Sequence, residues 1–314
     1  MEVEECMAVS VRGLYFVVTL FLGSFLGSIL MLVPVLPLML MSPAWYRWIT
    51  NSIVATWLTL HVALLELVFG VMVVITGDGF IPEEHSVIIM NHRTHLEWMF
   101  LWCCLLRYSY LRLEKIYLKV GPQPQEEDHS HMENMLEYFC DIREPLQLLL
   151  FPEGTDLTDY TRARSDDFAE MNDLPKFEYV LQHRTTGFTF IMDSLRNGNN
   201  LDAIHDITVA YPKNIPQTER HLILGEFPRE IHFHVRCCEA SILPFRPAGL
   251  YLYIDDLGGR LSDLYAAEPL GFPQGVCRVP PCKTELHMAL IKTSLFYWSS
   301  FITLLRRPLA LGLI

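Results

Sequence analysis

Short apolar runs that end in polar residues divide the middle of the chain into predicted strands. Most of these runs are apolar almost throughout, as expected of strands buried on both faces of a sheet, and one alternates apolar residues with histidines. The predicted strands are Val87–Met90, Leu148–Phe151, Ile207–Ala210 and the alternating Ile231–Val235. Candidate helices begin after Thr94 and lie around Met132–Phe139 and Phe188–Leu195. The order of these elements predicts one α/β domain over residues 77–284.

Two long apolar stretches precede this domain and predict a membrane anchor over residues 1–76. No charged residue occurs from Leu14 to Met41, and the run from Ile53 to Thr76 contains only His61 and Glu66. Each stretch is longer than the roughly 20 residues that a helix needs to cross a bilayer. A cleaved signal peptide is disfavoured, because its first residues should be basic and here they are mainly acidic.

The arrangement of the anchor is left open by the sequence. Pro34 and Pro37 interrupt helical hydrogen bonding, which argues against one straight span through Met41. Two helices joined near Ser42–Pro43 either cross the membrane or enter one leaflet and return. At the other end of the chain, residues 285–314 form a C-terminal hydrophobic segment, whose apolar run Met288–Leu305 suits a span or a helix lying on the membrane surface equally well.

Charge and cysteine content exclude several classes of protein. The 314-residue chain is 51% hydrophobic and has a formal net charge of −12, which argues against nucleic acid as a partner, because phosphate binding needs clustered lysine and arginine. The eight cysteines include no C-x-x-C pair, so neither a zinc site nor a disulfide framework is expected, and no metal is assigned. Thiols facing a reducing cytosol fit this pattern.

Two short motifs follow two of the predicted buried strands. Asn-His-Arg-Thr-His-Leu-Glu occupies residues 91–97, and Phe-Pro-Glu-Gly-Thr occupies residues 151–155. Ligands bind open α/β sheets at the carboxyl ends of the strands, where both motifs fall. His92 is a possible general base with Glu97 as its orienting carboxylate, because the pKa of histidine lies near neutral pH. Gly154 and Thr155 are possible anion contacts.

Other residues compete for these roles. His95 is an alternative base three residues after His92. The pattern His-x-x-His-x-Glu differs from the zinc motif His-Glu-x-x-His, so a metal site is not favoured here. Arg184 is a candidate for a further phosphate contact, and an ordinary surface arginine is the competing interpretation. Neither Ser86 nor Thr94 lies in the Gly-x-Ser-x-Gly pattern of a nucleophile.

The two motifs resemble the signatures H-x-x-x-x-D and F-P-E-G-T of the glycerophospholipid acyltransferase family. Flanking stretches, including residues 98–102, 205–212 and 227–235, are similar to family members that act on lysocardiolipin. The resemblance implies an acyltransferase-type α/β domain with N-terminal membrane helices. It implies direct acyl transfer without an acyl-enzyme, His92 and Glu97 as the catalytic pair, and Glu153, Gly154 and Thr155 as contacts to the acyl acceptor.

The same resemblance implies substrates and a location. Acyl-CoA is the expected co-substrate and no cofactor is expected. The expected acceptor is lysocardiolipin, lysophosphatidylglycerol or lysophosphatidic acid. The expected location is the endoplasmic reticulum membrane, with the site at the cytosolic surface.

The chain departs from the family pattern at two places. Glu97 stands where the family has aspartate. Between the motifs, the family's glycine-containing block with an arginine for the acceptor is not found, because Leu118-Lys119-Val120 runs directly into Gly121-Pro122 and an acidic segment. A catalytically impaired lipid-binding homologue or splice form is therefore the alternative to an active enzyme.

Overall fold

A mixed β-sheet forms the centre of the molecule. The computed structural model describes residues 10–79, 84–107, 114–116, 126–142, 146–177, 180–183 and 185–239. Within these residues the sheet has six strands in the order β1-β6-β5-β2-β4-β3. The strands are β1 Met72–Gly77, β2 Ser86–Met90, β3 Glu114–Ile116, β4 Gln147–Leu150, β5 Ala203–Ala210 and β6 Glu230–Glu239. All neighbouring pairs are parallel except β5 and β6, so β2, β4 and β5 end at one edge.

The four strands predicted from the sequence are confirmed as β2, β4, β5 and β6. In β6, Ile231, Phe233 and Val235 are fully buried and the intervening His232 and His234 are partly exposed, as the alternation predicted. Two strands, β1 and β3, were not predicted. Residues 72–76, which the sequence placed with the anchor, are part of the sheet because Met72–Gly77 pairs with β6.

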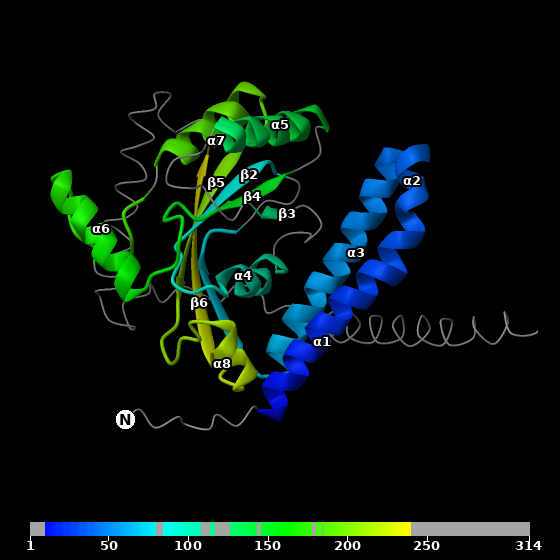
Figure 1. The fold of residues 1–314 in the computed structure, drawn as a ribbon, viewed down its shortest axis with the longest axis horizontal. Helices are drawn as coiled ribbons and strands as arrows, with labels where there is room; N and C mark the ends of the chain where they lie inside the picture. The colour runs from blue at the N-terminus through cyan, green and yellow to red at the C-terminus, as the bar shows by residue number, and fades with distance from the viewer. Residues whose placement is uncertain are drawn as a thin grey trace, which may run out of the picture.

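Helices cover both faces of the sheet (Figure 1). On one face, α4 Glu97–Leu105 and the end of α3 Pro43–Ala63 pack on Ile88, Met90 and Val209. On the other face, α5 Glu126–Ile142 and α7 Thr185–Asn197 pack on Val87 and Ile89. Because successive residues of β2 face opposite layers, the whole strand is buried. The three predicted helices are confirmed as α4, α5 and α7. Two further helices, α6 Asp159–Met171 and α8 Glu219–Ile223, lie after β4 and β5.

A helical hairpin stands out from one side of this domain (Figure 1). Its first arm comprises α1 Val11–Gly27, a π-helical turn Ser28–Leu32, a 3-10 turn Val33–Val35 and α2 Leu36–Met41. The second arm is α3 with the π-helical turn Leu64–Val68. The interruption near Pro34 and Pro37 and the junction at Ser42–Pro43 confirm the expected break.

The surface of the hairpin is strongly apolar. Large exposed hydrophobic side chains include Phe21, Phe25, Leu40, Trp45 and Trp48. In the part of the chain that the structure describes, Pro43–Val68 is the one helix long and apolar enough to cross a membrane, and Val11–Gly27 is apolar but shorter. The C-terminal hydrophobic segment, residues 285–314, lies outside the described residues.

The base of the hairpin is fixed to the domain by close packing. Phe16, 1% exposed, meets the rings of Phe69 and Phe227 at centroid distances of 5.4 and 5.1 Å. A Cβ on Gly13 would lie 2.2 Å from the carbonyl oxygen of Leu222, so α1 approaches α8 as closely as only a glycine permits. The first arm is therefore seated directly on α8.

A buried ion pair joins the second arm to α4. The Arg107 guanidinium donates to both carboxylate oxygens of Glu66, at 3.0 and 3.2 Å, and also to the carbonyl of Cys103. The two side chains are only 6% and 12% exposed. A bidentate pair in this environment holds the end of α4 against the π-helical turn that contains Glu66.

Replacing Arg107 by methionine is expected to destabilise the protein strongly. The change leaves the Glu66 carboxylate buried without its cation, which typically costs about 3–5 kcal/mol. Denaturant unfolding of the full chain in detergent measures this loss. The double variant Arg107→Met/Glu66→Gln should recover a large part of it, and Arg164→Met, on the exposed surface of α6, should change little. A single variant as stable as the wild type would show that water already solvates the pair.

Candidate active site

The two motifs meet at the edge of the sheet where β2 and β4 end. These strands pair in parallel with Ile89 opposite Leu150, so the chain leaves both strands at adjacent positions. Asn91, 2% exposed, fixes the exit from β2, because its side-chain amide donates to the Val209 carbonyl of β5 and accepts from the Val209 N–H. The residue after it, His92, is thereby placed at the rim that the sequence predicted.

The structure brings His92 and Glu97 together. His92 Nδ1 lies 3.3 Å from Glu97 Oε2, at the long end of hydrogen-bonding distance. Glu97 is fully buried as the first residue of α4, and its two oxygens also accept from the backbone N–H of Arg93 at 2.8 and 2.7 Å. The His92 ring packs on Phe151 with centroids 4.5 Å apart. With Nδ1 turned to Glu97, Nε2 is the ring nitrogen directed away from that carboxylate.

Burial is the main cause of the pKa shifts of His92 and Glu97. It lowers the pKa of His92 below its usual 6.5, and electrostatic interactions with Glu153 and Asp156 offset part of the shift. It also raises the pKa of Glu97 well above its usual value, against the backbone hydrogen bonds from Arg93 and Thr94. A His92 with a lowered pKa keeps one ring nitrogen unprotonated at neutral pH, which is the form that a general base requires.

Glu153, in the loop after β4, is hydrogen-bonded to the loop after β2 and to the segment at Leu181. Its side chain is buried, with Oε1 accepting from the His92 N–H at 2.8 Å and Oε2 from the Leu181 N–H at 3.0 Å. Burial raises the pKa of Glu153 to about 8 although these two amides lower it. The Leu157 N–H in turn donates to the His92 carbonyl at 3.0 Å. The sequence predicted that Glu153 contacts the acyl acceptor, whereas in the structure both of its carboxylate oxygens accept hydrogen bonds from backbone amides.

The other predicted contacts have different surroundings. Gly154 has φ +70°, in the left-handed region that favours glycine, and its N–H closes a turn on the Phe151 carbonyl at 3.0 Å. The Thr155 hydroxyl is 3.4 Å from Asp156 Oδ1. Arg184 lies outside the described residues, as does the segment between β3 and α5 in which the family's arginine block was sought.

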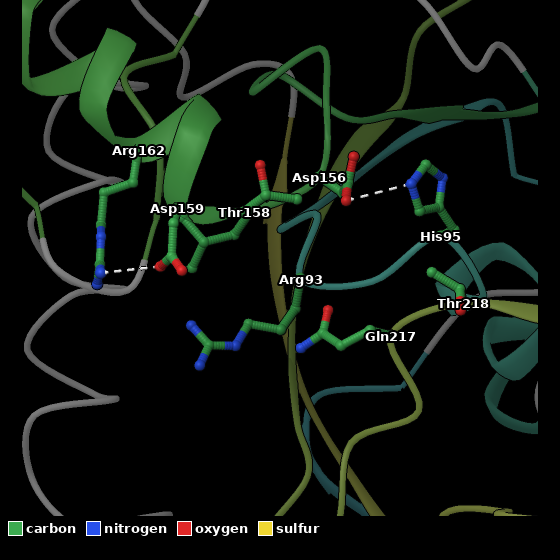
Figure 2. Close-up of a pocket in the computed structure, with 9 residues that line it drawn as sticks. Arg93, His95, Asp156, Thr158, Asp159, Arg162, Gln217 and Thr218 are labelled. Carbon is green, nitrogen blue, oxygen red and sulfur yellow. Dashed lines mark hydrogen bonds and ion pairs between the residues drawn. The ribbon is translucent and has the colours of Figure 1, made fainter. Parts of the chain in front are cut away.

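A pocket of about 460 Å³ opens beside these loops (Figure 2). Its lining comes from the segments after β2 and β4, from α6 and from the segment before α8, namely Arg93, His95, Asp156, Leu157, Thr158, Asp159, Arg162, Gln217 and Thr218. His95 Nε2 lies 3.2 Å from Asp156 Oδ2, so His95 pairs with this aspartate. The rings of His92 and His95 are 6.4 Å apart. The described residues contain no group of three or more histidine, cysteine or acidic side chains suited to a metal ion.

The sequence did not single out Arg93, Asp156, Arg162 or Gln217. Arg93 stands next to His92, and Asp156 directly follows the second motif, so position in the chain offered a signal for these two. Arg162 and Gln217 carry no such signal, because they reach the pocket only through the packing of α6 and the segment before α8.

Comparison with known proteins identifies the family. The chain is 60% identical to lysocardiolipin acyltransferase 1 of Gallus gallus over 93% of its own length and 84% of that protein. It is 32% identical to lysophosphatidylinositol acyltransferase 10 of Caenorhabditis elegans, over 92% of the chain and 78% of the relative. The chain belongs to the glycerophospholipid acyltransferase family. This acyltransferase therefore carries its two motifs on a sheet edge that presents a histidine–carboxylate pair.

Two further comparisons concern family models and solved structures. No family model matches the acyltransferase. Among solved structures, the 1-acyl-sn-glycerophosphate acyltransferase PlsC of Thermotoga maritima aligns with a TM-score of 0.42 and 12% identity, over 82% of this chain and all of that one.

Removing the Glu153 carboxylate is expected to destabilise the acyltransferase. Leucine at this position leaves the His92 and Leu181 amides without acceptors, and each orphaned amide costs about 1–3 kcal/mol, so we expect a loss of roughly 2–6 kcal/mol. Glutamine keeps one acceptor oxygen and should lose about half as much. Urea unfolding in detergent compares both variants with Glu170→Gln, an exposed site on α6 that should behave as the wild type. Equal losses for leucine and glutamine would contradict the two-amide role.

Proposed function

We propose that the protein is a membrane-bound acyl-CoA:lysophospholipid O-acyltransferase that acts on lysocardiolipin or a related anionic lysophospholipid. The observation that carries the proposal is the His92–Glu97 contact of 3.3 Å, at the rim of the sheet and in a chain of this family. The names of its relatives include lysocardiolipin and lysophosphatidylinositol acyltransferases, which supports a glycerophospholipid acceptor with an anionic head group.

In the proposed reaction His92 acts as the general base. Its Nδ1–H donates to Glu97, and its unprotonated Nε2 takes the proton of the acceptor hydroxyl. The hydroxyl oxygen then attacks the thioester carbonyl carbon and forms the new C–O bond, with the negative charge on the carbonyl oxygen. Collapse breaks the C–S bond, and the departing thiolate of CoA takes the proton back from His92. The step needs no acyl-enzyme, and Glu97 orients the ring and stabilises the imidazolium.

The glutamate at position 97 is compatible with this role. Its side chain is one methylene longer than the aspartate of the family, but the Arg93 N–H binds both carboxylate oxygens and holds the group within reach of Nδ1. The extra length is therefore accommodated in the turn between β2 and α4. This geometry supports activity in the presence of the substitution.

The apolar hairpin supports attachment to a membrane. Its exposed side chains include Trp45 and Trp48 at the start of α3, a residue type enriched at the membrane interface. We propose that the hairpin anchors the protein in the endoplasmic reticulum membrane with the His92 rim facing the cytosol, where acyl-CoA is available.

One observation favours a second candidate, a catalytically impaired lipid-binding homologue. The sequence from Leu118 to Pro124 lacks the glycine-containing block with an arginine that the resemblance leads one to expect. In this alternative the same pocket binds lipid without acyl transfer. The two candidates differ in turnover, which can be measured directly.

Membranes that contain the full chain should transfer a labelled oleoyl group from oleoyl-CoA to lysocardiolipin or lysophosphatidylglycerol. His92→Ala should lower the rate by at least roughly a hundredfold, because general base catalysis typically contributes 10²–10⁴-fold. His95→Ala tests the competing base and should retain far more activity than His92→Ala. Equal rates for the wild type and the His92 variant, from protein shown to be folded, would leave the lipid-binding alternative.

The acid limb of the pH–rate profile should report the protonation of His92. Because burial lowers the pKa of His92, kcat/KM should fall with decreasing pH around a midpoint below 6.5. Asp156→Asn removes a negative charge that raises this pKa, so its midpoint should lie lower still. Asp167→Asn, an exposed change on α6, should leave the midpoint unchanged. A midpoint that rises in Asp156→Asn would contradict the assignment of this limb to His92.

A further inference from the structure

Two arginine side chains from different segments line the pocket beside His92. Arg93 comes from the turn after β2, and Arg162 comes from the second turn of α6. Figure 2 shows both arginines among the residues that line the pocket, while Asp156 is turned toward His95. Two arginine side chains that line one pocket provide a site suited to phosphate, which arginine binds through paired N–H donors.

The backbone of Arg93 is fixed relative to the base. Its N–H donates to both oxygens of the fully buried Glu97, and its neighbour in the chain is His92. A phosphate held by Arg93 is therefore confined to the vicinity of the His92 ring. Because these contacts use the backbone of residue 93, a changed side chain at this position leaves them in place.

The start of α6 positions Arg162. Thr158 and Thr161 form a reciprocal cap, and the Arg162 N–H donates to the Thr158 carbonyl at 2.9 Å. The guanidinium pairs with Asp159 at 3.2 Å, and the side chain of Asp159 is fully exposed. An exposed pair of this kind contributes roughly 0.2–1 kcal/mol, less than a bidentate contact to phosphate, so a phosphate can displace Asp159.

The acidic groups of the pocket already have partners. Asp156 contacts His95 and Asp159 contacts Arg162. The remaining polar lining includes Gln217, Thr218 and Thr158, whose amide and hydroxyl groups can donate to phosphate oxygens. The pocket thus combines two arginines and neutral donors with two carboxylates, each of which already contacts a basic side chain.

We propose that this pocket binds the phosphate of the acyl acceptor's head group and that Arg93 and Arg162 determine its preference for anionic lysophospholipids. The assignment rests on the proposed acyltransferase function and deepens it. In a 1-acyl lysophospholipid the reacting hydroxyl and the phosphate are on neighbouring carbons of glycerol. A lipid whose phosphate binds Arg93 therefore brings its hydroxyl close to His92. The phosphates of CoA are separated from the thioester by the long pantetheine arm, which disfavours them as the occupant.

Steady-state kinetics of the full chain in membranes test the assignment. Arg162→Gln and Arg93→Gln should each raise KM for lysocardiolipin roughly tenfold, the loss of about one charge-assisted contact, with KM for oleoyl-CoA nearly unchanged. Arg162→Lys, which keeps the charge without the paired donors, should lie between Arg162→Gln and the wild type. Arg164→Gln on the same helix, outside the pocket lining, is the matched control and should match the wild type. A rise confined to KM for oleoyl-CoA, or no rise for either substrate, overturns the proposal.

A binding measurement separates this proposal from the function on which it rests. Saturation-transfer NMR should detect binding of sn-glycero-3-phosphoglycerol, an unreactive head-group probe, to the full His92→Ala chain in detergent. Adding Arg162→Gln should abolish that signal without changing the thermal unfolding midpoint, whereas adding Arg164→Gln should preserve it. If the probe binds in this way but the wild type transfers no acyl group, the pocket stands and the enzyme proposal fails. A probe that does not bind, or that binds equally with and without Arg162, overturns the pocket assignment whatever the rate.

Discussion

The buried carboxylate of Glu153 joins two segments that meet at the rim of the sheet. It accepts from the backbone of His92, at the end of β2, and from that of Leu181, and it is itself part of the loop after β4. The reverse contact from Leu157 to the His92 carbonyl closes the connection between the two motif loops. Since the parallel pairing of β2 and β4 brings these loops side by side, the position of the His92 ring depends on both the strand register and this carboxylate.

The sequence predicted the centre of the sheet well because its strands are apolar on both faces. It missed β1, whose Val73 and Ile75 continue an apolar stretch that begins in α3, so composition does not separate the anchor from a strand. It missed β3 because the residues Glu114-Lys115-Ile116 have no strand-like apolar pattern. Position relative to the strands, together with the family resemblance, was sufficient to pair His92 with Glu97.

The surroundings of the pair could not be predicted in the same way. Glu153 belongs to a motif, and from sequence alone a motif carboxylate suggests a ligand contact. Its actual partners are amides 61 and 28 residues away, a relationship that only the fold creates. The pocket has the same origin, because Arg93, Arg162 and Gln217 are distant in the chain and meet through the packing of three segments.

The short helix α8 connects two features that otherwise seem separate. Its capping residue Thr218 lines the pocket, and its carbonyl oxygens at Leu222 and Ile223 receive the backbone of α1 at Gly13. The position of the pocket relative to the apolar hairpin therefore depends on α8, a helix of little more than one turn. If the hairpin anchors the enzyme as proposed, this short link fixes the distance of the pocket from the membrane surface.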